Sequence, residues 1–394
     1  MKLRLYLNSV IFAENWASDK KKIDASHKMV YDCAMTQDRK PRILSIMLGR
    51  GAGGLESVLI DHATAFDQMG YYSSILCHQK SWVLPRLKAQ DKIKFHTIPS
   101  SSLYNPVAWV ALAKVIREER PDILCLHGNR AISFCTSPIL KALIHPFPKV
   151  MATTHNNRNK LFHRLDGIFS ISQFLTENLI HDFHIDANKI FACPNMAPLP
   201  EDIPQYKEQT PLRIGFLRRL EIDKGGDVLL DACKILKDKK VPFHVVMAGD
   251  GSKRTEYQEF VNKNGLSDNI SFIGWVSDKA KFFSQVDIVC IPSRAEGQPL
   301  ALLESMSYGK PAVVSTCPGM LEVISPLSAG LSFPIGDANA LADRLTTLIQ
   351  DSKMRSDFAE RSRQTYFKYY TPTAQKKNLA RGIEALMHQS HHAR

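Results

Sequence analysis

Residues 42–70 read RILSIMLGRGAGGLESVLIDHATAFDQMG, and this stretch decides the fold class. A short apolar run leads into glycine-rich residues 49–54, and a helical pattern follows up to Gly70, a residue type that often ends helices. The glycines let backbone amides and the helix N-terminus approach an anion or a sugar closely. A strand that turns through glycines into a helix predicts the first unit of a doubly wound α/β sheet.

The same alternation continues on both sides of a proline-rich segment. Strand patterns such as DILCLH (122–127) alternate with helical patterns such as residues 107–120, and the alternation restarts at residue 212 with LRIGFL. The segment between holds five prolines, which deny it helix or central strand: Pro194, Pro198, Pro200, Pro204 and Pro211. The sequence therefore predicts two α/β domains with parallel sheets, joined by a linker and facing across a cleft.

Composition excludes several classes of protein. The 394 residues are 44% hydrophobic and 23% charged, as in soluble globular chains, and no apolar run approaches the ~20 residues of a membrane-spanning helix. The net charge is +12, with most of the excess before residue 200, so an anionic lipid or a phosphorylated substrate is an expected partner. No nucleic-acid-binding motif accompanies the charge, so nucleic acid is not expected. Eight cysteines without a Cys-x-x-Cys pair predict neither disulfides nor a zinc site, and indicate a reducing cytoplasm.

The glycine-rich loop also fits the spacing G-x-G-x-x-G through Gly49, Gly51 and Gly54. This spacing is typical of dinucleotide-binding dehydrogenases, which need an acidic residue at the end of the second strand to hold the ribose. Residues 68–90 contain no Asp or Glu, so a nicotinamide site is not expected. A tight turn without a ligand remains the structural alternative for this loop.

A more specific set of residues lies in the second half. Arg219 and Lys224 occupy the loop after its first strand, where a guanidinium fork and an ammonium group suit a diphosphate. Glu296 follows a later strand, and Glu304 stands eight residues on, in a helix that Pro299 opens. Amides at the start of that helix can bind phosphate, and the Glu304 carboxylate can accept hydrogen bonds from both ribose hydroxyls. Solvent exposure is the alternative for Glu304, but it stands among leucines, where an unpaired carboxylate is costly.

These segments together resemble the retaining glycosyltransferases of family four. The resemblance covers residues 42–394 and is carried by GAGGLE, RRLEIDKGG, AGDG, FIGWV, EGQPLALLESMSYGKPAVVST and PGMLEVI. It implies the GT-B fold, in which two Rossmann-like domains face each other across a cleft. The catalytic residues that it implies are His155, Glu296, Arg219 and Lys224. The donor-binding residues that it implies are Gly53, Gly54, Arg219, Lys224, Gly297, Gln298, Pro299, Leu300 and Glu304.

The resemblance gives these residues separate roles. Glu296 lies near the donor sugar and Glu304 grips the ribose. Arg219 and Lys224 hold the diphosphate, and His155, in the segment TTHNN, lies near the transferred sugar. The glycine-rich loop lies against the donor phosphates and the acceptor.

The chain departs from the family pattern at two places. Arg218 stands where the family has glycine, so either Arg218 or Arg219 is the phosphate contact, and Gln298-Pro299 replaces an aromatic-glycine pair. No Asp-x-Asp metal motif occurs, in agreement with a family that uses arginine, lysine and helix N-termini in place of a divalent cation. We therefore expect no metal and no cofactor besides the substrate.

Five segments follow from the pattern and the resemblance. They are an N-terminal extension of unknown role (1–40), an acceptor-side domain (41–196), a linker (197–211), a nucleotide-sugar-binding domain (212–365) and a C-terminal helix that crosses back to the first domain (366–394).

The implied activity is transfer of a hexose-type sugar from a nucleotide diphosphate sugar, UDP-sugar rather than GDP-sugar, with retention at the anomeric carbon. The acceptor is a hydroxyl of a glycan or a lipid-linked glycan, in the synthesis of cell-surface polysaccharide or lipopolysaccharide. The basic first half suggests contact with an anionic membrane at its cytoplasmic face. The alternatives are a sugar-nucleotide epimerase of the same architecture and a catalytically silent nucleotide-binding scaffold.

Overall fold

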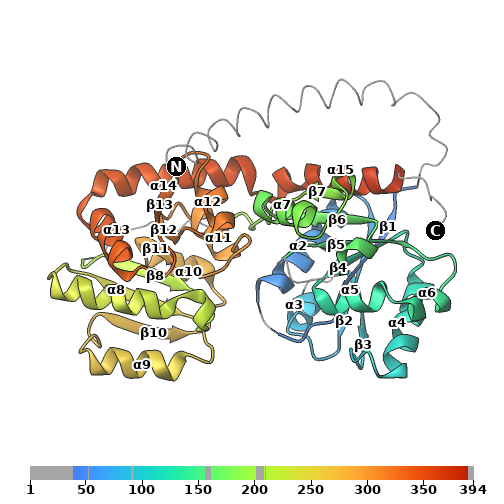
Figure 1. Cartoon of the computed structure of the whole chain (residues 1–394), viewed down its shortest axis with the longest axis horizontal. Helices are drawn as coiled ribbons and strands as arrows, with labels where there is room; N and C mark the ends of the chain where they lie inside the picture. The colour runs from blue at the N-terminus through green and yellow to red at the C-terminus, as the bar shows by residue number, and fades with distance from the viewer. Residues whose placement is uncertain are drawn as a thin grey trace, which may run out of the picture.

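Two parallel sheets, each with helices on both faces, form the two domains of the computed structural model (Figure 1). The structure describes residues 39–51, 53–89, 93–155, 161–200, 208 and 210–388. Most of the expected N-terminal extension and part of the expected linker, including Pro204, lie outside these residues. The predicted architecture of two parallel-sheet α/β domains is confirmed.

Within the described residues, the first sheet has seven strands in the order β3-β2-β1-β4-β5-β6-β7. Its strands are β1 (Arg42–Met47), β2 (Tyr72–His78), β3 (Lys94–Ile98), β4 (Ile123–His127), β5 (Lys149–Thr153), β6 (Gly167–Ser170) and β7 (Ile190–Ala192). Its helices are α2 (Gly54–Gln68), α3 (Leu84–Ala89), α4 (Pro106–Glu119), α5 (Asn129–Cys135), α6 (Pro138–Leu143) and α7 (Gln173–His181).

The second sheet has six described strands in the order β10-β9-β8-β11-β12-β13. They are β8 (Arg213–Leu217), β9 (His244–Ala248), β10 (Ile270–Gly274), β11 (Ile288–Ile291), β12 (Ala312–Ser315) and β13 (Gly330–Phe333). The helices are α8 (Gly226–Asp238), α9 (Arg254–Lys263), α10 (Lys279–Ser284), α11 (Leu300–Ser307), α12 (Pro318–Ile324), α13 (Ala338–Gln350), α14 (Ser352–Tyr369) and, on the first domain, α15 (Pro372–His388).

Local sequence explains where these elements begin and why the sheets are central. Every residue of β4, β11 and β12 is buried, as expected for strands covered on both faces. Asn105 caps α4 by accepting a hydrogen bond from the Val107 amide, and Pro106 follows at the first helical position. In the first sheet β1 lies between β2 and β4, and in the second sheet β8 lies between β9 and β11. Because the strands are parallel, their carboxyl ends lie at one edge of each sheet, where the loops that follow them can bind a ligand.

The C-terminal helices connect the domains, as Figure 1 shows along one side of the molecule. On α14 the buried Tyr366 packs in the second domain and donates a hydrogen bond to the Ala197 carbonyl, 3.0 Å away. On α15, Gly382 packs so closely on Phe169 of β6 that a Cβ would lie 2.3 Å from the ring. The crossing therefore falls between the two helices, after Tyr369, and α15 completes the core of the first domain. None of the described helices has the length and apolar character that a bilayer span requires.

Candidate active site

The loop between β11 and α11 lies between the two domains. The Asn195 side chain donates a hydrogen bond to the Gln298 carbonyl, 2.9 Å away, and the Asn195 backbone amide donates to the Gln298 side chain. A Cβ on Gly297 would lie 3.0 Å from the Leu175 side chain, and one on Gly54 would lie 3.2 Å from Leu300. The structure therefore brings the expected donor-binding loop against the glycine-rich loop. The Gln298 side chain itself takes part in the contact between the domains.

A second contact between the domains lies nearby. The carboxylate of Glu322, on α12, accepts hydrogen bonds of 2.7 Å from the amides of Gln173 and Phe174 at the start of α7. An anion at a helix N-terminus satisfies amides that have no partner within the helix. The carboxylate thus joins α12 of the second domain to α7 of the first.

The basic residues of the second domain gather around Glu296. The Lys224 ammonium lies 2.8 Å from Glu296 Oε1 and 3.1 Å from Asp223, and the Arg218 guanidinium pairs with the same glutamate oxygen. The side chains of Arg218, Lys224 and Glu296 are only 7%, 15% and 12% exposed. Burial lowers the pKa of Arg218 to about 10, so the guanidinium stays charged at neutral pH. This arrangement places two cations on one carboxylate where the loops after β8 and β11 meet.

Neighbouring strands hold this cluster together. Arg218 directly follows β8, Lys224 ends a 3₁₀ turn before α8, and Glu296 follows β11, which pairs with β8. Gly225 has a φ of +70°, and a Cβ there would lie 1.9 Å from the Pro292 carbonyl oxygen. Only glycine fits this position, so the turn that presents Lys224 depends on it.

Arg218 and Arg219 have different surroundings. Arg218 is the buried partner of Glu296, whereas Arg219 is exposed. The charge of Arg219 acts on Glu56, in the first turn of α2, where it opposes the rise of the carboxyl pKa caused by burial. The charge of Arg219 therefore reaches the first turn of α2, next to the glycine-rich loop. Sequence reasoning left the choice between the two open and assigned no site role to Arg218 alone.

Glu304 lies on α11, whose N-cap is Pro299. Its side chain is 20% exposed, and the Lys279 ammonium lies 3.3 Å from Oε2. Across the cleft, burial raises the pKa of Asp61 on α2 to about 7; Arg86 opposes this shift and Glu304 adds to it. Glu304 therefore lies close enough to α2 for its charge to act on Asp61.

His155 follows β5 in the first domain, next to the donor-binding loop. A Cβ on Gly297 would lie 3.5 Å from the His155 carbonyl oxygen. Burial lowers the pKa of His155 to about 4, so its imidazole is neutral at neutral pH. A neutral imidazole in this place can exchange hydrogen bonds with a sugar hydroxyl.

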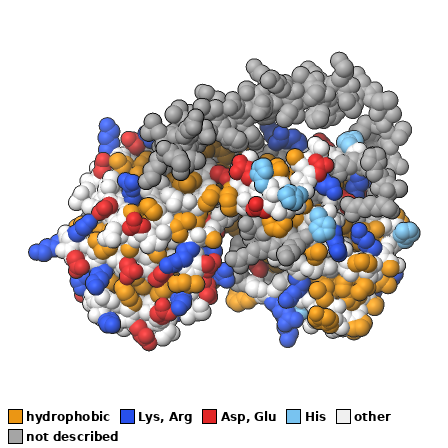
Figure 2. All heavy atoms as spheres, viewed as in Figure 1, with side chains coloured by type: hydrophobic (Ala, Val, Ile, Leu, Met, Phe, Trp, Pro, Cys, Tyr) orange, Lys and Arg blue, Asp and Glu red, His pale blue; other side chains and the backbone are white. Residues whose placement is uncertain are grey.

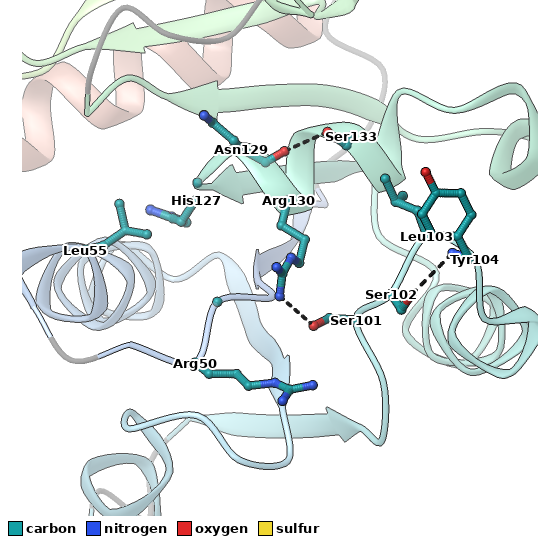
Figure 3. Close-up of a pocket in the computed structure, with 12 residues that line it drawn as sticks. Arg50, Leu55, Ser101, Ser102, Leu103, Tyr104, His127, Asn129, Arg130 and Ser133 are labelled. Carbon is teal, nitrogen blue, oxygen red and sulfur yellow. Dashed lines mark hydrogen bonds between the residues drawn. The ribbon is translucent and has the colours of Figure 1, made fainter.

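A pocket of about 990 Å³ opens at the carboxyl ends of the first sheet (Figure 3). The lining residues come from the glycine-rich loop and the first turn of α2, from the loop before α4, and from the end of β4 with α5: Gly49, Arg50, Leu55, Ser101, Ser102, Leu103, Tyr104, His127, Gly128, Asn129, Arg130 and Ser133. Arg130 donates a 3.1 Å hydrogen bond to Ser101, and Arg50 lies opposite in the same pocket (Figure 3). Sequence reasoning missed this pocket because its residues come from three loops far apart in the chain.

Comparison with known families agrees with the fold. Residues 52–199 match the family described as Glycosyltransferase Family 4, and residues 200–365 match the family described as Glycosyl transferases group 1. The two matches cover both domains, one each. The chain therefore belongs to the GT-B glycosyltransferases.

Individual relatives have related names. An uncharacterized glycosyltransferase of Haemophilus influenzae is 21% identical, over 79% of this chain and 91% of its own length. The amylovoran biosynthesis glycosyltransferase AmsK of Erwinia amylovora is 33% identical over 36% of each chain. The N,N'-diacetylbacillosaminyl-diphospho-undecaprenol alpha-1,3-N-acetylgalactosaminyltransferase of Campylobacter jejuni is 30% identical over 43% of this chain and 48% of its own length. This chain thus spans less than half of AmsK and of the Campylobacter enzyme.

Among solved structures, HepE of Anabaena in complex with UDP and glucose is similar in fold. Its TM-score is 0.74 at 18% identity, and the match covers 87% of this chain and 99% of HepE. At this identity the likeness supports the fold.

Proposed function

We propose that the protein is a retaining glycosyltransferase that moves a hexose-type sugar from a nucleotide diphosphate sugar to a hydroxyl of a glycan or lipid-linked acceptor. The observation that carries this proposal is the cluster of Lys224, Arg218 and Glu296, with Arg219 exposed beside it and Glu304 on the adjacent helix. A diphosphate, a sugar and a ribose can each meet a suitable group there.

Each group has a defined task in the proposed reaction. The leaving diphosphate gains negative charge as the glycosidic bond breaks, and Arg219 and Lys224 stabilise that charge. Amides at the start of α11 add further positive potential, and Glu304 holds the ribose. The neutral imidazole of His155 orients a hydroxyl of the transferred sugar. The cations of the protein thus supply the charge that a divalent metal supplies in other transferases.

The state of Glu296 favours a front-face route to retention. Its carboxylate is already paired with Lys224 and Arg218, which lowers its nucleophilicity compared with a free carboxylate. In a front-face route no glycosyl-enzyme bond forms: the acceptor oxygen attacks on the side from which the diphosphate leaves, and the leaving phosphate takes the acceptor proton. Glu296 then positions the sugar and the cations around it.

Relatives support a UDP-sugar donor and a cell-surface product. HepE is described with UDP and glucose, AmsK is named for amylovoran biosynthesis, and the Campylobacter enzyme is named for a diphospho-undecaprenol acceptor. We therefore propose UDP-sugar over GDP-sugar and a role in polysaccharide or lipopolysaccharide synthesis.

The pocket of the first domain is the proposed acceptor site. Arg50 and Arg130 suit an anionic acceptor, such as a phosphate-linked glycan. Hydrophobic side chains gather on the surface around α4 (Figure 2), where Tyr104, Val107 and Val110 are 97%, 57% and 64% exposed. We propose that this surface touches the cytoplasmic face of an anionic membrane that carries the acceptor. Binding to anionic vesicles should weaken as salt rises, and equal binding to neutral vesicles at every salt concentration would contradict membrane attraction by charge.

The function is tested by product analysis. UDP-, GDP- and ADP-sugars are each incubated with mixtures of glycan and polyprenyl-diphosphate acceptors, and products are read by mass spectrometry and by NMR at the anomeric centre. We expect one sugar added to an acceptor, release of UDP and an α-linkage from an α-donor. An isomerised sugar nucleotide without any acceptor would instead identify an epimerase. Donor binding without turnover across the acceptors would identify a silent scaffold, and a β-linkage would contradict retention.

A further inference from the structure

Three side chains that commonly bind metals meet inside the first domain. His62 lies on α2, and Cys125 and His127 lie two residues apart on β4, so their side chains share one face of the sheet. Each offers one ligand atom, and these atoms all lie within 4.8 Å of one another. All three residues are buried. None of them belongs to the proposed donor site, although His127 also lines the pocket (Figure 3).

The imidazoles of this cluster are poorly satisfied by the described residues. Among the described residues, neither ring nitrogen of His62 has a hydrogen-bond partner, and Nδ1 of His127 has none either. The other nitrogen of His127, Nε2, lies 3.8 Å from the Cys125 sulfur, a long contact. Polar groups that are this deeply buried normally have a hydrogen-bond partner, so these unpaired ring nitrogens indicate that a ligand binds them. Their surroundings are apolar and aromatic: Phe66 and Phe169 pack edge-on against His62.

The spacing of the cluster suits one tetrahedral ion. Two imidazoles that bind one zinc ion at about 2.0–2.1 Å have ring centroids about 5 Å apart. The centroids of His62 and His127 lie 5.4 Å apart. Tetrahedral zinc with nitrogen and sulfur ligands separates those ligand atoms by about 3.3–3.8 Å, so shifts of about 1 Å in the side chains would close the set.

We propose that His62, Cys125 and His127 bind one zinc ion. Two imidazoles and one thiolate are a donor set typical of zinc. On binding, the Cys125 thiol releases its proton to solvent as the sulfur–zinc bond forms, and the neutral imidazoles contribute lone pairs. His155 is not part of the set, since its ring centroid lies 6.1 Å from that of His127. Water or a group from the pocket fills the fourth position.

Such an ion would connect two elements that shape the active site. α2 begins at the glycine-rich loop, and β4 leads into Gly128, Asn129 and Arg130 of the pocket. A bond from each element to one ion fixes the loop relative to the pocket. The role is structural, because the charges proposed for the diphosphate lie in the other domain.

Metal content of the full-length protein tests the proposal. We expect about one zinc per chain after purification, and binding weakened at least tenfold in His62→Gln and Cys125→Ala, measured by competition with a chromogenic chelator. The matched controls are His78→Gln and Cys135→Ala, which alter a buried histidine and a buried cysteine outside the cluster and should retain zinc. Cobalt(II) in place of zinc should give thiolate-to-cobalt charge-transfer absorption in the parent and in Cys135→Ala.

The cobalt spectrum and thermal unfolding of the parent keep the test decisive if a variant fails to fold. Zinc should raise the melting temperature of the metal-free parent. A parent that purifies without zinc, shows no charge-transfer band with cobalt and melts at the same temperature with added zinc would overturn the proposal. So would full zinc binding by Cys125→Ala. Glycosyl transfer is read separately, so failure here would leave the proposed function standing.

Discussion

The Lys224 ammonium lies 2.8 Å from Oε1 of Glu296, although 72 positions separate the two residues. The contact exists because the loops that follow β8 and β11 emerge from paired strands. It joins the residue proposed to hold the diphosphate to the residue proposed to face the sugar. Loss of the Lys224 side chain should therefore affect catalysis more than folding, because Arg218 still pairs with Glu296.

Lys224→Met should lower kcat/KM for the nucleotide sugar by about 10²–10³-fold, because a cation aimed at the developing charge of the leaving group is removed. Arg218 remains to pair with Glu296, so the fold should be retained. The measurement is steady-state kinetics with UDP release. Lys239→Met is the matched control, since Lys239 pairs with Asp343 at an exposed site. Equal loss in both variants would contradict the role of Lys224.

Arg218→Met should destabilise the second domain by about 1–3 kcal/mol, because a charge-assisted contact to the buried Glu296 is lost. The free energy of unfolding in urea measures this. Arg254→Met removes an exposed pair with Asp250 and should change stability by less than about 1 kcal/mol. An Arg218 variant as stable as the parent would show that the buried pair adds nothing.

Asp61 predicts a pH dependence of stability. Burial raises its pKa from 3.8 in the unfolded chain to about 7, so between these values only the folded state holds the proton. Its contribution to stability is full below pH 4 and falls by up to about 1.4 kcal/mol per pH unit until pH 7. Asp61→Asn should lack this slope. Urea unfolding of both proteins from pH 4 to 8 measures the difference, and parallel curves would contradict the raised pKa.

Arg130→Ala should raise KM for an anionic acceptor about tenfold and leave KM for the donor unchanged, because Arg130 lines the acceptor pocket and not the donor loop. Arg344→Ala, an exposed change in the second domain, serves as control. A rise in donor KM alone would place the donor in this pocket instead.

The alternation of strands and helices predicted the two sheets well, because parallel strands covered on both faces have apolar sequences such as residues 123–127. The order of the motifs predicted Lys224 after the first strand of the second domain and Glu296 after a later strand, and in the structure these two side chains are in contact. The different surroundings of Arg218 and Arg219 could not be predicted from the sequence. Both residues stand in the same loop, and Arg218 becomes the buried one because Glu296, which follows the neighbouring strand β11, pairs with it.

The histidine–cysteine cluster was also beyond reach of the sequence. His62 is separated from Cys125 and His127 by two strands and two helices, so no short metal-binding spacing exists. Taken alone, Cys125 and His127 fit the sequence pattern of a buried strand. The three side chains come together only because α2 packs on the sheet next to β4.

If the nucleotide diphosphate binds at Lys224 and Glu304, stabilisation of the protein by UDP against thermal unfolding should depend on these two side chains. At 100 times its dissociation constant, UDP should stabilise the parent by about 2.7 kcal/mol. Glu259→Ala, an exposed change on α9, should respond like the parent, whereas Lys224→Ala and Glu304→Ala should respond far less. Equal stabilisation of all four proteins by UDP would show that the nucleotide does not bind at Lys224 and Glu304.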